Sequence, residues 1–194
     1  VDRKFYQELE KAFENDKFTI ENTERLIHSH GQETFKDIYK VLYKSIDRLV
    51  DLVFYPESEE DVRKIIEIAL KYNVCLIPYG GGTNVTRALS VPENEKRTVV
   101  SIDTRRLSKI EWINKEDRRV CVEAGITGKN LDELLKKEGF MIGHEPDSVE
   151  LSTIGGWIAT NASGMKKNKY GNIEDIVENV HLVTPKGEIC LLYT

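Results

Sequence analysis

Residues 74–84 read Val-Cys-Leu-Ile-Pro-Tyr-Gly-Gly-Gly-Thr-Asn, and this stretch decides the fold. It opens with a short apolar run typical of a buried strand, and three consecutive glycines follow. Because glycine has no Cβ, such a run can turn sharply, adopt positive φ and point successive N–H groups into one concavity. That concavity would bind a phosphate or pyrophosphate, and the alternative interpretation is a plain tight turn.

The residues on either side of this stretch predict a β–α–β unit. Residues 49–55 form an apolar run that Pro56 ends, and Ser58 then caps a helix whose apolar side chains recur at helical spacing. The apolar run at 74–77 follows this helix, and a further strand is expected over 98–102. A strand–helix–strand crossover joins parallel strands by a right-handed connection, so the glycines follow the carboxyl end of a parallel strand.

The first quarter of the chain is predicted to be helical and carries no chemical motif. Apolar side chains recur on one face of a first helix, a second helix is expected over 22–29, and a third over 34–44. The apolar residues that mark the first and third helices are Phe5, Leu9, Phe13, Phe35, Ile38, Val41 and Leu42.

The chain after residue 108 predicts a mixed lobe of strands and helices. The expected elements are a hairpin over 110–123, helices over 127–137 and 153–160, and strands over 177–183 and 189–192 joined by a turn at 184–187. We therefore expect an α+β fold in which a helical segment at 1–48 precedes a domain at 49–194. The two lobes of that domain are expected over 49–102 and 108–194.

A second pair of glycines, Gly155 and Gly156, lies in the first turns of the helix predicted over 153–160. Each glycine costs a helix roughly 1 kcal/mol relative to alanine, so something must come close to this helix to offset the cost. One interpretation is a cofactor groove lined by the small polar residues at 160–164. The other is close packing of the helix on the sheet.

Composition and motifs exclude several functions. The chain has 194 residues, is 40% hydrophobic and has a formal charge of −5, and this acidic balance argues against a nucleic-acid-binding domain. No apolar run approaches the roughly 18 residues of a membrane span. The distant Cys75, Cys121 and Cys190 are expected to be buried, reduced thiols. Motifs of nucleotide hydrolases, dinucleotide folds and serine hydrolases are absent, and no metal site is expected.

The chain resembles the flavin-binding domain of the vanillyl-alcohol-oxidase superfamily at 78–84, at Ser-Thr-Ile-Gly-Gly (152–156) and at Thr-Asn-Ala-Ser-Gly (160–164). Within that superfamily it resembles the alkylglycerone-phosphate synthase (alkyl-dihydroxyacetone-phosphate synthase) family. That likeness rests on Gly-His-Glu-Pro-Asp-Ser (143–148) and Lys-Lys-Asn-Lys-Tyr-Gly-Asn-Ile-Glu-Asp (166–175).

The resemblance implies a two-lobed FAD-binding domain of the vanillyl-alcohol-oxidase type. By motif match, the first segment would cradle the FAD pyrophosphate, and 146–152 and 160–163 would line the ribityl chain and the ring. A Thr-Asn pair stands where covalent members of the superfamily carry His, so we expect FAD that can dissociate. The implied cofactor-binding residues are Pro78, Tyr79, Gly80, Gly81, Gly82, Thr83, Asn84, Pro146, Asp147, Ser148, Val149, Glu150, Leu151, Ser152, Thr160, Asn161, Ala162 and Ser163.

The resemblance also implies a transferase of ether-lipid synthesis in peroxisomes. Such an enzyme exchanges the acyl chain of acyl-dihydroxyacetone phosphate for a long-chain fatty alcohol and uses its flavin without net redox. A homodimer and a peripheral membrane association of the full-length enzyme are implied as well. The catalytic residues of the family follow the point where this chain ends, so we expect a truncated domain without assignable catalytic residues.

Other interpretations stay open from the sequence alone. The same domain could serve an FAD-linked 2-hydroxy-acid dehydrogenase, or the chain could be a non-catalytic nucleotide-binding fragment. His144 and Glu145 are adjacent and could do acid–base work, although a structural loop histidine is the other interpretation. The basic run at 166–169 either attracts a phosphate or is a solvated surface.

Overall fold

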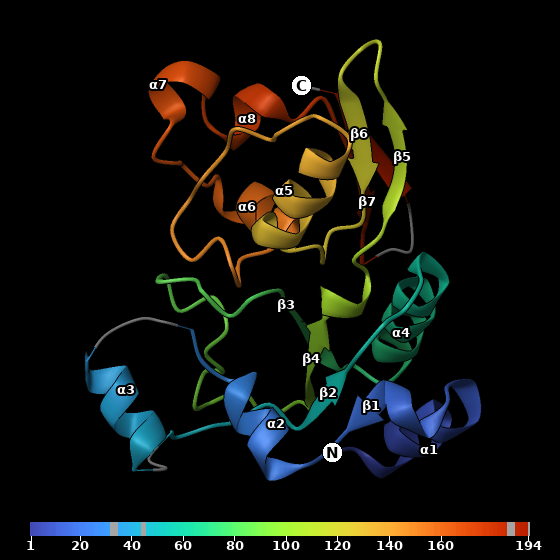
Figure 1. Ribbon diagram of the computed structural model, residues 1–194. Helices are drawn as coiled ribbons and strands as arrows, with labels where there is room; N and C mark the ends of the chain where they lie inside the picture. Colours follow the sequence, from blue (N-terminus) through green and yellow to red (C-terminus); the bar gives the residue numbers. More distant parts are fainter. Residues whose placement is uncertain (32–34, 44–45, 186–188, 194) are drawn as a thin grey trace.

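The computed structural model describes residues 1–31, 35–43, 46–185 and 189–193. It has two lobes stacked one above the other (Figure 1). The first lobe contains a mixed sheet with α1 (Arg3–Ala12) and α4 (Glu59–Lys71) beside it. The second lobe carries the shorter helices and two hairpins. This arrangement is the α+β architecture that the sequence predicts.

The first lobe is built on a four-stranded sheet in the order β1-β2-β4-β3. Its strands are β1 (Phe18–Thr19), β2 (Leu52–Phe54), β3 (Cys75–Tyr79) and β4 (Val99–Asp103). Strands β2 and β3 both run parallel to β4, and β1 is antiparallel to β2 at the edge. The predicted crossover is therefore present, but β4 lies between the two strands that the crossover joins.

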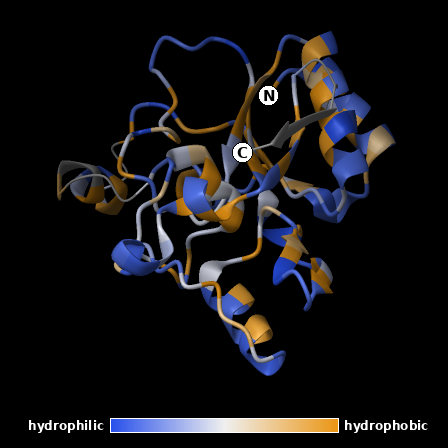
Figure 2. Cartoon of the chain, turned by 90° about the horizontal axis from the view of Figure 1, so that it is seen from above, coloured by the Kyte–Doolittle hydropathy of each residue, from blue (hydrophilic) through white to orange (hydrophobic). Residues whose placement is uncertain are grey.

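Both faces of the sheet are buried at β2 and β4. One face of β2 and β4 packs against the apolar stripes of α1 and α4, as the two-residue period of strand side chains requires. This cluster contains Phe5, Leu9, Phe13, Phe18, Leu52, Phe54, Ile65, Ile68, Ala69, Val74, Val100 and Ile102. The opposite face carries a smaller cluster of Val50, Val53, Val91 and Val99. In Figure 2 the helices carry both hydrophobic and hydrophilic residues, consistent with one buried and one solvated side.

A charged pair connects the N-terminal segment to α4. Lys17 donates from its Nζ to both carboxylate oxygens of Asp61, at 3.1 and 2.9 Å. Ser58 caps the helix, as predicted, by accepting from the Asp61 N–H. Burial alone would raise the pKa of Asp61, but hydrogen bonds from Lys17 and the Glu57 N–H outweigh burial and hold that pKa below its usual value.

The segment before residue 49 is more than a helical extension. Helices α1 and α2 (Asn22–Ile27) form as predicted, but residues 18–19 add the edge strand β1 to the sheet. Phe5 and Leu9 are fully buried in the core of the first lobe. The N-terminal segment and the first lobe therefore share one hydrophobic core.

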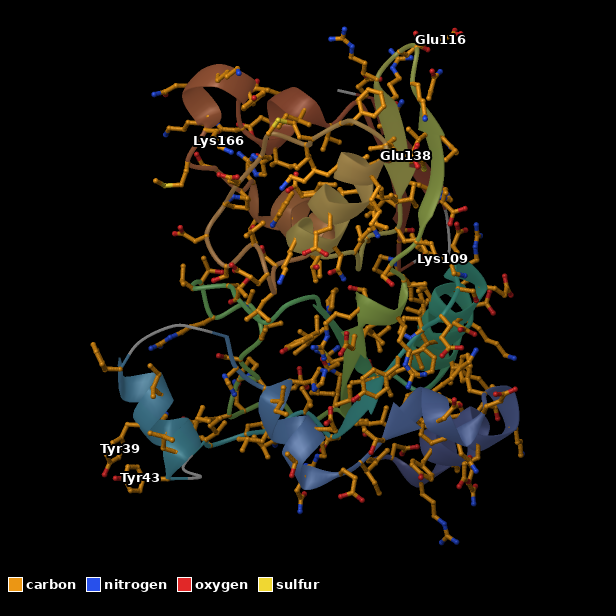
Figure 3. The ribbon with its side chains drawn as sticks, in the orientation of Figure 1. Tyr39, Tyr43, Lys109, Glu116, Glu138 and Lys166 are labelled. Atoms are coloured by element: carbon orange, nitrogen blue, oxygen red, sulfur yellow. The ribbon has the colours of Figure 1, made fainter. Side chains whose placement is uncertain are left out.

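Helix α3 (Phe35–Leu42) forms where the third helix is predicted, although the predicted ends at residues 34 and 44 lie outside the described residues. Its apolar side chains point outward, with Phe35 91% and Leu42 72% exposed. Tyr39 and Tyr43 project from the edge of the molecule, with ring centroids 4.3 Å apart (Figure 3). The amphipathic pattern therefore predicted the helix correctly, but Phe35 and Leu42 do not pack in a core.

The second lobe has its own core. Its elements are β5 (Ile110–Asn114), β6 (Arg119–Val122), α5 (Gly128–Lys137), α6 (Ile154–Thr160), α7 (Lys167–Tyr170), α8 (Ile173–Ile176), β7 (Asn179–Val183) and β8 (Ile189–Tyr193). The two predicted hairpins are both antiparallel pairs, β5–β6 and β7–β8, and part of the predicted 184–187 turn lies outside the described residues. Trp157 of α6 is 2% exposed at the centre of a cluster with Leu131 and Leu135 of α5. Figure 1 shows α5 and α6 crossing in the middle of this lobe.

Two expectations about thiols and membranes can be compared with the structure. Cys75 and Cys121 are free but half-buried rather than buried, and the side chain of Cys190 lies outside the described residues. None of the helices in the described ranges has the length and hydropathy needed to cross a membrane.

Candidate functional site

The glycine loop, residues 80–84, begins directly after β3 at the carboxyl end of the parallel strands. Gly82 adopts a φ of +67°, a conformation that L side chains rarely take. Within the described residues, no main-chain N–H of this loop donates to a protein acceptor. Residues 80–84 are all half-buried, and their main-chain N–H groups are available to an acceptor from outside the chain.

The wall opposite the glycine loop comes from the second lobe. A Cβ added to Gly81 would overlap the carbonyl oxygen of Leu151, and one added to Gly80 would overlap the Thr153 hydroxyl. The main chain of the loop therefore lies directly against residues 151–153. The structure thus brings together two of the predicted segments that are about 70 residues apart in the sequence.

Most of the predicted segment at 146–152 makes its hydrogen bonds within the second lobe. Ser148 has a φ of +55°, and its carbonyl accepts from the N–H groups of Leu151 and Ser152. The carbonyls of Val149 and Ser152 accept from the first turn of α5. The Ser152 hydroxyl accepts from the Trp157 indole at 2.8 Å in the core. Only the end of this segment, at 151–152, borders the glycine loop.

The third predicted segment, 160–163, lies at the far end of α6, about 10 Å from its start at a rise of 1.5 Å per residue. Thr160 donates its hydroxyl to the Gly156 carbonyl, and Asn161 ends the helix in the left-handed conformation. Ala162 packs on the core, and the Ser163 hydroxyl donates to Asn172. These residues are separated from the glycine loop by the length of α6.

The glycine pair in α6 serves packing. The Gly155 N–H donates to the Ala124 carbonyl at 2.8 Å, and the Gly156 N–H donates to the capping Thr153 hydroxyl at 3.2 Å. A Cβ on Gly155 would lie 2.8 Å from the Ala124 Cβ, closer than real side chains approach. At Gly155, the group that comes close to this helix is therefore Ala124 of the same chain.

Two buried residues beneath the glycine loop were not assigned a role from the sequence. Asp103 ends β4 and pairs in register with Tyr79, the residue before the loop. His28, at the end of α2, contacts Asp103 with its Nε2 at 2.9 Å, and its ring lies 4.3 Å from the Tyr79 ring. Asp103 follows a predicted parallel strand, and this position could have indicated that it lies near the glycine loop. The sequence around His28 gives no such indication.

The Asp103 carboxylate is held ionised although it is only 1% exposed. Burial alone would raise its pKa, but hydrogen bonds from His28 and from the Arg105 side chain and N–H outweigh burial, and the pKa is lowered. Arg105 donates from Nη2 at 2.6 Å and from Nε at 3.0 Å. The same guanidinium lies 5.4 Å from the centre of the Tyr79 ring.

The neighbouring His144 and Glu145 do not form an acid–base pair. His144 is 1% exposed and lies edge-on to Trp157, and neither ring nitrogen has a hydrogen-bond partner among the residues that the structure describes. Burial lowers its pKa. Glu145 instead accepts from Lys166 at 2.7 Å on the surface, where Figure 3 places Lys166. The two adjacent side chains are therefore divided between the core and the surface of the second lobe.

Comparison with known families identifies the domain. The model of the FAD binding domain family matches residues 50–192. The chain belongs to the FAD binding domain family. FAD is accordingly the cofactor indicated, and the FAD-binding fold predicted from the sequence is confirmed.

The predicted resemblance to alkyl-dihydroxyacetone-phosphate synthases is also confirmed. The chain is 50% identical over 185 residues to the alkyldihydroxyacetonephosphate synthase of Caenorhabditis elegans, covering 95% of this chain and 30% of the relative. A solved structure of an alkyldihydroxyacetonephosphate synthase matches all of this chain and 36% of its own with a TM-score of 0.93 at 37% identity. A mitochondrial D-lactate dehydrogenase of Arabidopsis thaliana is 31% identical over 92% of this chain and 29% of the relative. The chain thus spans about a third of the length of the proteins it matches.

The residues present fit FAD at the glycine loop. A pyrophosphate offers acceptor oxygens, and the loop offers main-chain N–H donors and carries no carboxylate among residues 80–84. The fit at 160–163 is a prediction that these contacts leave untested.

Proposed function

We propose that this chain is the FAD-binding part of a transferase that replaces the acyl chain of acyl-dihydroxyacetone phosphate with a long-chain fatty alcohol. The observation that carries the proposal is the set of N–H groups at 80–84, which have no protein acceptor in the described part of the chain and lie against residues 151–153. The chain is also 50% identical over 185 residues to an alkyldihydroxyacetonephosphate synthase. In the exchange, the fatty acid leaves with its ester oxygen and the alcohol oxygen takes its place.

The residues of this chain bind and orient the cofactor. The N–H groups of residues 80–84 hold the pyrophosphate, and Gly82 lets the loop turn around it. Residues 151–153 close the opposite side of the loop, and 160–163 line the ribityl chain and ring at the other end of α6. FAD, when bound, supplies the exchange chemistry without net oxidation or reduction.

An FAD-linked 2-hydroxy-acid dehydrogenase is the second candidate, because D-lactate dehydrogenases are also similar to this chain. The lower identity, 31% against 50%, favours the transferase. A non-catalytic nucleotide-binding role is the third.

Two assays on the complete polypeptide that contains these residues separate the candidates. With acyl-dihydroxyacetone phosphate and a labelled long-chain alcohol, we expect label in an ether product and release of one fatty acid per product. Under anaerobic conditions with D-lactate or glycolate, we expect the flavin absorbance to stay unbleached. Bleaching without ether product would favour the dehydrogenase, and neither reaction would favour a non-catalytic role.

The proposal extends to the cellular setting of the full-length enzyme. We propose a peroxisomal homodimer that associates peripherally with membranes, since both substrates carry long alkyl chains. Co-sedimentation with vesicles, mass measurement in solution and imaging of a tagged complete polypeptide test these three points separately.

A further inference from the structure

The glycine loop rests on a buried network that begins in the N-terminal segment. The His28 side chain is fully buried, with Nδ1 2.7 Å from the Glu24 carbonyl and Nε2 2.9 Å from Asp103 Oδ2. Both ring nitrogens therefore have an oxygen within hydrogen-bond distance, one on the main chain of α2 and one on the Asp103 side chain. The Glu24 carboxylate lies 3.8 Å from Nδ1.

This network reaches the loop through Tyr79. Tyr79 is 5% exposed, and its ring centre lies 4.3 Å from that of His28 and 5.4 Å from the Arg105 guanidinium carbon. The Thr104 hydroxyl donates to the Tyr79 carbonyl at 3.1 Å, which fixes the main chain at the start of the loop. The Tyr79 hydroxyl lies directly beneath Gly82, where an added Cβ would overlap it. The ring therefore supports the loop at its residue of positive φ.

A second contact joins the same N-terminal segment to the other end of the loop. A Cβ added to Gly31 would overlap the Asn84 carbonyl oxygen and lie 2.8 Å from its Nδ2. Gly31 follows His28 by three residues, so one short segment contacts both Tyr79, the residue before the loop, and Asn84, the last residue of the loop. Neither Lys17 nor Asp61, the other charged pair of this lobe, has a contact with the loop among the described residues.

We propose that His28 and Asp103 are positioning residues for the FAD pyrophosphate: through Tyr79 they hold the glycine loop in the shape that presents its N–H groups. This inference rests on the proposed role of the loop in FAD binding. It assigns the N-terminal segment a role in cofactor affinity, where its sequence shows no chemical motif. Loss of the network should let the loop leave this shape. We therefore expect the FAD Kd to rise further than the loss of thermal stability alone would explain.

The test compares two acid-to-amide variants, Asp103→Asn and Asp61→Asn, in the complete polypeptide. Each change removes the charge of a buried carboxylate in the first lobe that pairs with a cation, Lys17 for Asp61 and Arg105 for Asp103. The apo-protein Tm is measured by circular dichroism, and the FAD Kd by quenching of flavin fluorescence. We expect both variants to lower Tm, but only Asp103→Asn to raise the FAD Kd, by about tenfold.

A second pair of variants tests rescue and covers the case in which Asp103→Asn fails to fold. His28→Leu removes both hydrogen bonds, whereas His28→Gln keeps one donor that can reach Asp103. We expect the FAD Kd to rise about tenfold in His28→Leu and only a few-fold in His28→Gln. A merely structural role would change Tm in both without this graded change in Kd.

The outcomes separate the inference from the proposed function. If the parent binds FAD and the folded His28 and Asp103 variants bind it equally well, the positioning role is wrong and the cofactor site stands. An equal rise in Kd for Asp61→Asn and Asp103→Asn would also overturn it, because the effect would then follow stability. If the parent polypeptide, loaded under the same conditions, binds no FAD, the proposed function fails first and the inference fails with it.

Discussion

Two glycine-rich regions, the glycine loop at 80–84 and the glycine pair at 155–156, look alike in the sequence and differ in the structure. The N–H groups of the loop have no acceptor within the described residues, whereas Gly155 and Gly156 donate to Ala124 and Thr153. The loop leaves donors for a ligand, and the pair lets two parts of the second lobe approach closely. Under the proposed function, main-chain donors without a protein acceptor, and not glycine content, distinguish the cofactor loop from the packing site.

The largest expected effect is on the glycine loop itself. In Gly81→Ala the new Cβ overlaps the Leu151 carbonyl, so the loop must move away from the second lobe. We expect the FAD Kd to rise about a hundredfold, equivalent to about 2.7 kcal/mol. Gly139→Ala is the matched control, since its Cβ would meet nothing within 4 Å and only its positive φ is strained. Equal FAD Kd values in the two variants would contradict the assignment of the loop.

The glycine pair should respond in stability instead. Gly155→Ala places a methyl group 2.8 Å from the Ala124 Cβ, and such overpacking costs about 1–3 kcal/mol of unfolding free energy. Chemical denaturation measures the loss, and Ala124→Gly in the same chain should recover part of it. The FAD Kd of the folded variant should stay within about twofold of the parent. A large loss of FAD affinity at unchanged stability would show that Gly155 and Gly156 belong to the cofactor site and not to a packing contact.

Acid should weaken the support of the glycine loop. The pKa of Asp103 is lowered in the folded chain, so its contribution to stability is present above the unfolded value of about 3.9 and is lost as pH falls through the folded pKa. We expect Asp103→Asn to lose less unfolding free energy than the parent between about pH 4 and pH 2. Parallel curves for parent and variant across that range would show that Asp103 is not held ionised by folding.

The smallest expected effect concerns Ser152. Its hydroxyl accepts from the buried Trp157 indole, so Ser152→Ala should cost about 1 kcal/mol of unfolding free energy. Its side chain faces the core, so the FAD Kd should not change. A weakened FAD affinity in this variant would place the hydroxyl in the cofactor site, as the motif match implies.

The sequence predicted the elements well where local patterns decide them. Ser58, Thr127 and Thr153 cap the predicted helices, and both hairpins pair as expected. The position of β4 between β2 and β3 could not be derived, because strand order depends on long-range pairing that no local period records. The two residues of β1 were missed for the same reason, since so short a strand has no pattern of its own.

The candidate site could be predicted in part. Motif match identified the glycine loop and residues 151–152 opposite it, because a backbone that turns sharply or packs closely requires glycine at particular positions. It could not decide whether the Ser152 hydroxyl accepts a hydrogen bond in the core or lines the cofactor groove, because both roles need the same residue type. His28 comes close to the loop only through the fold, since it and Asp103 are 75 positions apart in the sequence.

Hydrogen exchange of the main-chain amides tests the central claim most directly. In the complete polypeptide without FAD, the amides of residues 80–84 should exchange quickly and those of Gly155 and Gly156 slowly, because only the latter have protein acceptors. On addition of FAD, we predict strong protection at 80–84 and little change at 155–156. Protection of the glycine pair with no change in the loop would contradict the account.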